Sequence, residues 1–326
     1  VLKHTILNPR RMVVLNTPYS TSVLVSDNEN IQLFKKCSAT RVRLSDDNTS
    51  ITKIEVYDQE QKRNIFISAK VYILAAGTLT NVRILLHSLR RIRDSIPNLY
   101  NNIGRYFSTH PKGNVGVIRL DKPLASDHFL FSVRKHSTYS SRLQFGLTEK
   151  ALIENQLLNH CLRFDSPFNH RATRIFDYIK NLLGSLPITR SGKGALVETL
   201  ANLGVSVYKV IDNIGTSGRS GKTLAVRAYF DQSASAENRI QLSDRKSQSG
   251  LPLAAIDWRF NEDDWGNAEK FLSIFSDQLR ANDLGEFLYK RPGPGEFTAI
   301  HSHFMGGTRI GSTSDDSVVD NNLNVH

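Results

Sequence analysis

The most constraining feature of this chain is a continuous apolar run, Val71–Leu74, that leads directly into Ala75–Gly77. An uninterrupted apolar run is typical of a strand that is buried on both faces. The residues that follow it carry almost no side chain, which indicates that another group approaches the backbone closely at that point. Thr78 or Thr80 is expected to cap a helix that begins immediately afterwards.

The rest of the chain predicts two groups of short strands. Before the apolar run, β-rich segments bounded by turn residues occur at Val23–Val25, Ile31–Phe34, Ala39–Leu44, Ile54–Tyr57 and Ile65–Ile67. After it, strands are expected at Asn114–Leu120, Phe129–Lys135, Leu224–Phe230, Arg239–Leu242 and Leu253–Phe260.

Two further helices are expected in the second half of the chain. One spans Arg171–Leu183, and the other opens after Asn261 with acidic residues in its first turn and ends near Ala281. The buried stripe of the second helix is predicted to consist of Trp265, Phe271, Leu272, Phe275 and Leu279.

Composition places the chain among folded globular proteins. Its 326 residues, 40% hydrophobic and 22% charged, suit about two domains. A net charge of +11 favours anionic partners without choosing among phosphate groups, nucleic acid and membrane surfaces. The two cysteines, Cys37 and Cys161, exclude a disulfide scaffold, and Cys161 is expected to pack in an apolar helix. No apolar run is long enough to predict a transmembrane helix.

Three local patterns imitate functional sites. The glycine-rich stretch Gly215–Thr223 lacks a glycine where Thr216 stands and precedes a predicted strand, so it is interpreted as a basic loop rather than a phosphate-binding loop. His301 and His303 have no third ligand at a suitable spacing, so no metal site is predicted. Arg90–Arg93 lacks interleaved aromatic residues, which favours a basic helix end over nucleic-acid binding.

Four segments, in order, resemble the glucose-methanol-choline (GMC) family of flavin-dependent oxidoreductases. They are Lys36–Leu44, Val71–Gly77 with Asn81–Leu86, Asn102–Pro111, and His303–Gly311 with Ser317–Asp320 and Val325–His326. Glu237–Leu242 and Gly250–Pro252 are similar to the central segment of the family, so the resemblance covers most of the chain.

The resemblance implies FAD as cofactor and assigns residues to it. His303 is the candidate catalytic base, because a neutral imidazole suits removal of a hydroxyl proton during hydride transfer to flavin N5. The residues expected to contact the cofactor are Ala39, Ala75, Ala76, Gly77, Gly306, Gly307 and Asp320. The catalytic partner, a His or Asn, is expected after His326, and the glycine-rich diphosphate loop is expected upstream.

The implied fold is α/β, with an incomplete Rossmann-like FAD-binding domain at residues 1–111 and 299–326. Residues 112–298 would form an α+β substrate-binding domain with an antiparallel sheet. The implied enzyme oxidises the CH–OH group of an alcohol such as a sugar or polyol, and FAD supplies the redox chemistry. The chain is expected to be a fragment, cut at both ends, that neither holds FAD nor turns over alone.

Two other interpretations stay open from the sequence. A different FAD fold, such as a flavin-dependent hydroxylase or an amine oxidase, shares the small turn at Ala75–Gly77. A basic binding protein could also retain a flavoprotein scaffold without activity. The sequence assigns no nucleic-acid partner, leaves the electron acceptor and substrate unidentified, and leaves both cytoplasm and periplasm open.

Overall fold

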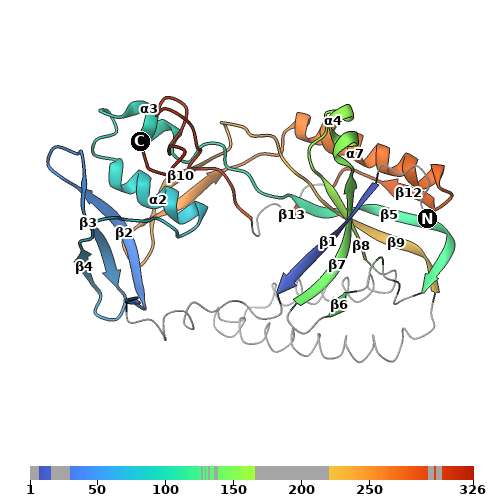
Figure 1. The fold of residues 1–326 in the computed structure, drawn as a ribbon, viewed down its shortest axis with the longest axis horizontal. Coiled ribbons are helices and arrows are strands. Elements are labelled where there is room, and N and C mark those ends of the chain that lie inside the picture. The colour runs from blue at the N-terminus through green and yellow to red at the C-terminus, as the bar shows by residue number, and fades with distance from the viewer. Residues whose placement is uncertain are drawn as a thin grey trace, which may run out of the picture. The chain divides into compact units, whose positions relative to one another are not determined.

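The computed structural model describes residues 7–15, 30–125, 128, 130, 133–135, 139–165, 220–292, 297–298 and 303–326. The chain divides into two compact units (Figure 1). The first, called here the sheet unit, comprises residues 1–18, 111–231 and 262–299. The second, called here the corner unit after Ala75–Gly77, comprises residues 19–110, 232–261 and 300–326.

These units differ from the expected domain boundaries in two places. Residues 1–18 belong to the sheet unit, although they were expected with the FAD-binding part. Residues 232–261 belong to the corner unit, although they were expected in the substrate-binding domain. The reason is strand pairing: Leu7–Leu15 pairs with a strand of the sheet unit, whereas Ile240 hydrogen-bonds to Gly104. The functional role of each unit stays a prediction.

The sheet unit is built on one antiparallel sheet of order β1-β7-β8-β9-β5-β12, with β6 and β13 attached to β7 and β5 (Figure 1). Its strands are β1 (Leu7–Leu15), β5 (Lys112–Ala125), β6 (Arg134–Lys135), β7 (Tyr139–Leu147), β8 (Cys161–Asp165), β9 (Ser220–Tyr229), β12 (Gly285–Tyr289) and β13 (Phe297–Thr298). The antiparallel sheet expected of this region is thus confirmed.

Helix α7 (Glu262–Ala281) packs on this sheet through the predicted apolar stripe, which is buried. Phe275 contacts Phe164 of β8 and Phe287 of β12, each with ring centroids 6.0 Å apart. The three acidic residues of its first turn complement the helix dipole, as the sequence predicted. A short helix, α4 (Glu149–Asn155), begins at Thr148, whose side chain accepts a hydrogen bond from the Ala151 N–H.

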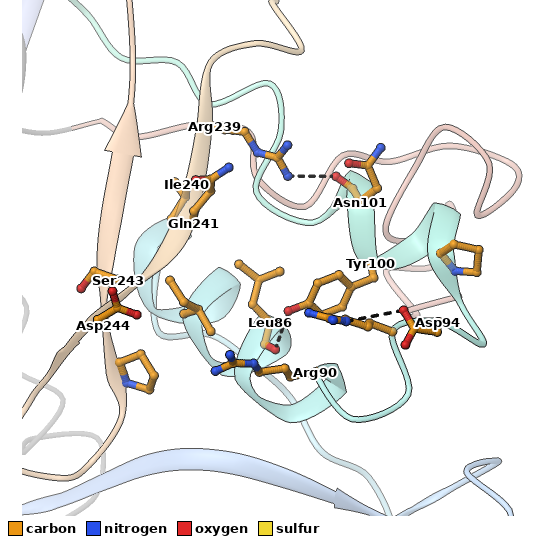
Figure 2. Close-up of a pocket in the computed structure, with 14 residues that line it drawn as sticks. Leu86, Arg90, Asp94, Tyr100, Asn101, Arg239, Ile240, Gln241, Ser243 and Asp244 are labelled. Carbon is orange, nitrogen blue, oxygen red and sulfur yellow. Dashed lines mark hydrogen bonds and ion pairs between the residues drawn. The ribbon is translucent and has the colours of Figure 1, made fainter.

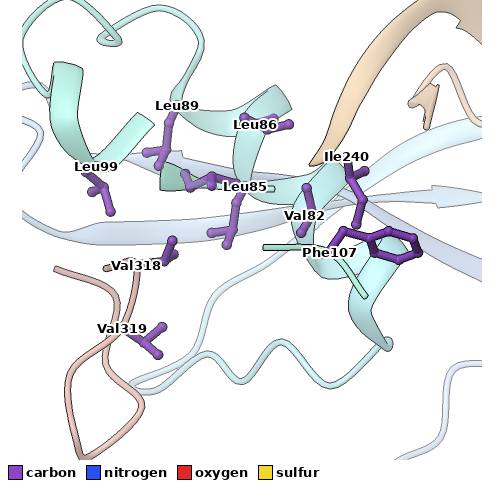
Figure 3. Close-up of a cluster of buried hydrophobic side chains, with 10 residues drawn as sticks. Val82, Leu85, Leu86, Leu89, Leu99, Phe107, Ile240, Val318 and Val319 are labelled. Atoms are coloured by element: carbon purple, nitrogen blue, oxygen red, sulfur yellow. The ribbon is translucent and has the colours of Figure 1, made fainter. Parts of the chain in front are cut away.

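The corner unit contains two small antiparallel sheets, β2-β3-β4 and β10-β11, and two helices (Figure 1). Their bounds are β2 (Cys37–Leu44), β3 (Ile51–Asp58), β4 (Arg63–Ile67), β10 (Arg239–Lys246), β11 (Pro252–Asp257), α2 (Thr78–Leu89) and α3 (Pro97–Asn102). Its core joins α2, α3, β10 and the C-terminal segment (Figure 3), and consists of Val82, Leu85, Leu86, Leu89, Leu99, Ile103, Phe107, Ile240, Val318 and Val319.

Two predicted strands are wrong. Val71–Leu74 forms no strand, and its side chains are not buried: Val71 is 74% and Ile73 83% exposed. Ile31–Phe34 is likewise irregular and exposed. A strand needs a neighbouring strand to which its backbone can hydrogen-bond, and an apolar run does not reveal whether one exists. Among the described residues, no strand pairs with either segment. The expected incomplete Rossmann-like domain is not seen in the described part of the chain, whose sheets are antiparallel.

Several smaller expectations have clear outcomes. Cys161 begins strand β8 instead of lying in a helix, since its neighbours pair with β9. Lys222 and Thr223 lie on strand β9, which agrees with rejecting a phosphate-binding loop there. The segments Val23–Val25 and Arg171–Leu183, residues 129, 131 and 132 of the predicted strand Phe129–Lys135, and His301 lie outside the described residues. The end of that predicted strand, Arg134–Lys135, forms β6. Within the described ranges, no helix is both long and apolar enough to cross a membrane.

Candidate functional site

The side chain of Asn81 fixes the backbone of the corner at Ala75–Gly77. The Ala76 N–H donates to Asn81 Oδ1 at 2.9 Å, and Asn81 Nδ2 donates to the Leu74 carbonyl at 3.0 Å. All three residues of the corner are exposed, and the Gly77 backbone has φ +80°, a conformation that favours glycine. The chain therefore turns sharply here without covering its own backbone.

Helix α2 begins at this corner without a side-chain cap. Its N-cap is Gly77, not Thr78 or Thr80 as expected, and its first turn contains no acidic residue. The first N–H groups of a helix have no partner within the helix and carry partial positive charge. The start of α2 thus presents uncapped donors beside an exposed, side-chain-poor backbone.

The Thr78 hydroxyl connects the corner to the turn that carries His303. Thr78 Oγ1 donates to the Phe304 carbonyl at 2.9 Å, so the residue after His303 is bonded to the first residue of α2. The side chain expected to cap the helix therefore fixes the two predicted parts of the site side by side. The Phe304 ring also packs against Phe107, with ring centroids 5.5 Å apart.

The two glycines of the His303 turn are required by protein packing. Both have φ +78°. A Cβ on Gly306 would lie 1.9 Å from the Tyr106 carbonyl oxygen, and one on Gly307 would lie 2.7 Å from Cγ2 of Val82. The groups that come close to these two glycines in the structure are protein atoms. Contact of Gly306 and Gly307 with a flavin stays a prediction.

The motif Asn102–Pro111 pairs directly with this turn. Ser108 and Met305 exchange two backbone hydrogen bonds of 3.1 and 3.0 Å, and the Gly104 N–H donates to the Gly307 carbonyl at 2.8 Å. The third and fourth segments of the family resemblance, far apart in the sequence, therefore form one backbone arrangement.

The central segment joins the same arrangement. The Phe107 N–H donates to the Asn238 carbonyl at 2.9 Å, and the Ile240 N–H donates to the Gly104 carbonyl at 2.8 Å. Asn238 is 4% exposed, and its side chain bonds to both backbone groups of Arg259. Asn238 was expected only as part of the motif Glu237–Leu242, because the hydrogen-bond partners of a buried asparagine cannot be identified from sequence.

His303 lies exposed at the start of its turn. Its backbone has φ +68°, which is uncommon for a residue with a Cβ. Its ring meets the His110 ring edge-on, with centroids 5.7 Å apart and an interplanar angle of 84°. The structure thus pairs two histidines from separate motifs, and His110 had no assigned role in the sequence analysis. Strained backbone held at an exposed polar residue is typical of functional sites.

Asp320 organises the C-terminal loop. Its Oδ1 accepts the backbone N–H groups of Asn322 and Asn324, each at 2.8 Å, and its Oδ2 accepts from the Asn324 side chain at 3.0 Å. These hydrogen bonds, that of the Asn324 side chain first, lower the pKa of Asp320. Its carboxylate therefore fixes a turn, and its predicted contact with a cofactor stays a prediction.

Ala39 lies on β2, opposite Val56 of β3. Strand β2 is bound to helix α2 through the Val42 N–H, which donates to Ser88 Oγ at 2.9 Å. The first segment of the resemblance is thereby attached to the helix that carries the corner. The contact predicted between Ala39 and FAD is a prediction that the structure does not test.

Next to this junction, His87 of α2 faces the Arg41 guanidinium, whose Nη2 lies 2.7 Å from His87 Nε2. Burial, and after it the charge of Arg41, lowers the pKa of His87 to about 4. His87 is consequently neutral at physiological pH and accepts from Arg41.

The described residues contain no cluster of three or more His, Cys, Asp or Glu side chains that could hold a metal ion. The sequence predicted no metal, and the finding applies only to the described part of the chain. His301, one half of the rejected histidine pair, lies outside it.

Comparison with known proteins agrees with this convergence of motifs. Residues 234–326 match the family model described as GMC oxidoreductase, and this match confirms the resemblance seen in the sequence. The segment contains the His303 turn, β10 and β11. No curated protein sequence matches the chain.

Two solved structures are similar to the chain. Pyridoxine 4-oxidase from Mesorbium loti has 14% sequence identity and a TM-score of 0.44, over 89% of this chain and 50% of its own. Formate oxidase from Aspergillus oryzae RIB40, studied for its FAD modification, has 16% identity and a TM-score of 0.49, over 93% of this chain and 55% of its own. The chain thus spans about half the length of these proteins.

Proposed function

We propose that the protein is an FAD-dependent oxidoreductase that acts on the CH–OH group of an alcohol such as a sugar or polyol. The observation that carries the proposal is the hydrogen bond from Thr78 to the Phe304 carbonyl, which fixes the His303 turn against the Ala75–Gly77 corner. Membership of residues 234–326 in the GMC oxidoreductases supports FAD-dependent oxidation as the reaction class.

The corner at Ala75–Gly77 has open space in which part of a dinucleotide cofactor would fit. Nothing lies within 4 Å of the position that a Cβ on Gly77 would take, so the corner is open. The uncapped N–H groups of α2 beside it are suited to a phosphate group. Ala75, Ala76 and Gly77 would therefore hold the cofactor, together with the start of α2. FAD, when bound, would accept the hydride from the substrate.

His303 is the group that this proposal places nearest the reaction. Its imidazole is exposed, so its nitrogen atoms are accessible to a substrate hydroxyl. A base within hydrogen-bond reach of that hydroxyl would take its proton as the carbon gives up hydride. The edge of the His110 ring restricts one side of His303. Backbone bonds between Met305 and Ser108 then keep the two histidine-bearing segments in register.

The test is flavin reduction by alcohols under anaerobic conditions in the intact protein. In His303→Ala, the flavin should stay bound while the reduction rate falls at least about 100-fold, the usual effect of losing a general base. His87→Gln is the matched control: it removes an imidazole of the same unit that is turned toward Arg41, and it should leave reduction unchanged.

Two outcomes would contradict the proposal at different levels. Unchanged reduction in His303→Ala would remove His303 from the mechanism while leaving the reaction class intact. Failure of sugars, polyols and simple alcohols alike to reduce the bound flavin would remove oxidation of CH–OH groups. Expression of residues 1–326 alone, which we propose neither retains FAD nor turns over, tests how much of the site this chain supplies.

A further inference from the structure

The corner unit contains a cavity of about 480 Å³ between the end of α2, α3 and β10 (Figure 2). Small-molecule sites typically have volumes of about 300–1,000 Å³. Its lining includes no residue of the Ala75–Gly77 corner and none of the His303 turn. The cavity is therefore separate from the residues to which the proposed function assigns the cofactor and the base.

Three arginines line this cavity, from two different parts of the fold. Arg90 ends helix α2 and Arg93 follows it, whereas Arg239 begins strand β10 (Figure 2). Arg93 is paired with Asp94 at 3.5 Å. The Arg90 guanidinium, in contrast, forms no hydrogen bond or ion pair with any residue of the described ranges. Guanidinium groups outnumber the carboxylates of the lining, Asp94 and Asp244, three to two.

Within the described part of the chain, the Arg239 side chain is held by a single long hydrogen bond. Its Nη2 donates to the Asn101 carbonyl at 3.4 Å, but its Nε is buried and has no hydrogen-bond partner among the described residues. Because that Nε is buried, the terminal nitrogens of the guanidinium are the ones that can meet acceptor oxygens of a ligand in the cavity.

Part of the remaining wall is apolar. Leu86 of α2 and the ring of Tyr100 face this space (Figure 2). Leu242 of β10 also lines it, beside the polar residues Asn101 and Gln241. The Tyr100 hydroxyl is directed to the Leu86 carbonyl at 3.4 Å, which leaves the ring as a wall of the cavity. A cavity with cationic groups and an apolar wall suits a ligand with an anionic head and an apolar body.

We propose that this cavity binds a small organic phosphate monoester, with the phosphate held by Arg90 and Arg239 and the organic body packed on Leu86 and Tyr100. Planar guanidinium groups match phosphate oxygens in pairs, which makes arginine the residue best suited to such a group. The volume of the cavity suits a small molecule. The arginines that resembled a plain basic helix end thereby contribute to a binding site.

Titration calorimetry with phenyl phosphate tests the site, with inorganic phosphate and phenol as separate probes of its two halves. Phenyl phosphate should bind at least about tenfold more tightly than either probe, because only it engages both the guanidinium groups and the apolar wall. Equal affinity for inorganic phosphate would overturn the organic part of the proposal. If phenyl phosphate does not bind at concentrations up to about 10 mM, the whole proposal is overturned, because even a weak site with a dissociation constant of about 1 mM would be filled at that concentration.

Variants locate the binding. Arg90→Gln and Arg239→Gln should each weaken phenyl phosphate binding about tenfold, as expected for losing a charge-assisted hydrogen bond. Arg91→Gln is the matched control, since it removes the same charge one residue away and does not line the cavity. Equal weakening in all three variants would show attraction by net charge alone. Because Arg90 is exposed at a helix end, its variant stays interpretable if Arg239→Gln fails to fold.

Saturating FAD separates this site from the proposed cofactor site. The affinity for phenyl phosphate should be the same with and without FAD. Competition between the two ligands would place the phosphate at the corner and overturn the proposal. Since the expected result does not depend on turnover, failure of the proposed alcohol oxidation would leave this test unaffected.

Discussion

Two histidines, one in each unit, show opposite relations to their surroundings. His160 of the sheet unit is fully buried; its Nδ1 accepts the Asp231 N–H at 3.0 Å, and its Nε2 lies 3.0 Å from Asn267 Oδ1. Phe230 and Phe271 enclose its ring. His303 of the corner unit is exposed, with a strained backbone and with the imidazole of His110 edge-on to its ring.

The difference teaches how to separate a structural histidine from a functional candidate. At His160 every polar atom of the ring is satisfied, and burial lowers its pKa, so the ring stays neutral and has no capacity left for a substrate. At His303 the fold holds an unfavourable backbone conformation at an exposed ring, for which we have proposed contact with a substrate. Stability should depend strongly on the first histidine and chemistry on the second.

The largest expected effect comes from His160→Ala. Truncation leaves the Asp231 N–H and the Asn267 side chain without their partner and opens a cavity among aromatic rings, which should cost about 4 kcal/mol of unfolding free energy. Denaturant unfolding followed by circular dichroism measures it. His303→Ala is the control and should change stability by less than about 0.5 kcal/mol. Equal losses of unfolding free energy in the two variants would contradict the distinction between the two histidines.

Gly306→Ala should be next in size. The added methyl group would collide with the Tyr106 carbonyl at a backbone φ of +78°, so we expect a loss of about 3 kcal/mol in the same measurement. Gly266→Ala is the matched control. Gly266 lies in α7 with open space around it, so alanine should stabilise by about 0.5–1 kcal/mol. A tolerated Gly306→Ala would show that the His303 turn is not tightly packed.

Acidification should weaken the fold through both neutral histidines. Burial lowers the pKa of His160, and burial with Arg41 lowers that of His87 to about 4. The unfolded chain takes up these protons near its ordinary pKa of about 6.5, while the folded chain does so only at lower pH. Stability should therefore be constant above about pH 6.5 and fall below it, by at most about 1.4 kcal/mol per pH unit for each proton.

Unfolding curves at pH 8, 6.5 and 5 measure this slope. His87→Gln should make the decline shallower because it removes one of the two groups. A slope of the opposite sign, or the same slope in the variant, would contradict the assignment of these imidazoles as neutral in the folded state.

The smallest expected effect is at His303→Gly. Glycine adopts φ +68° without strain, but it also gains freedom in the unfolded chain, so the net change should be a stabilisation of about 0.5 kcal/mol. The same variant should lose flavin reduction as His303→Ala does. Stabilisation with loss of activity would support the distinction between a structural His160 and a functional His303, whereas destabilisation would show that the His303 imidazole supports the fold.

Much of the fold follows from local sequence patterns. Helix α7 begins and ends as predicted because an acidic first turn and an apolar stripe at helical spacing are local signals. The strand at Arg239–Leu242 was expected for the same kind of reason. Val71–Leu74 could not be predicted correctly because a strand also needs a neighbour, and hydropathy does not identify one.

The candidate site was predictable only as separate motifs. The glycines at 306 and 307, the corner and His303 were recognisable from family resemblance, yet their mutual contacts depend on residues far apart in the chain. The bond between Thr78 and Phe304 and the pairing of His110 with His303 are such contacts. No local pattern encodes which partner a hydroxyl or a ring will meet after folding.

The bond between Thr78 and Phe304 also determines when the site can form during synthesis. Its two residues are 226 positions apart. A ribosome adding about 5–20 residues per second needs roughly 10–45 s to cover that interval. For that time the nascent chain carries α2 and the corner without the turn that packs on Val82. The turn joins the corner only when the last part of this sequence emerges, so until then helix α2 lacks one of the segments that pack on it.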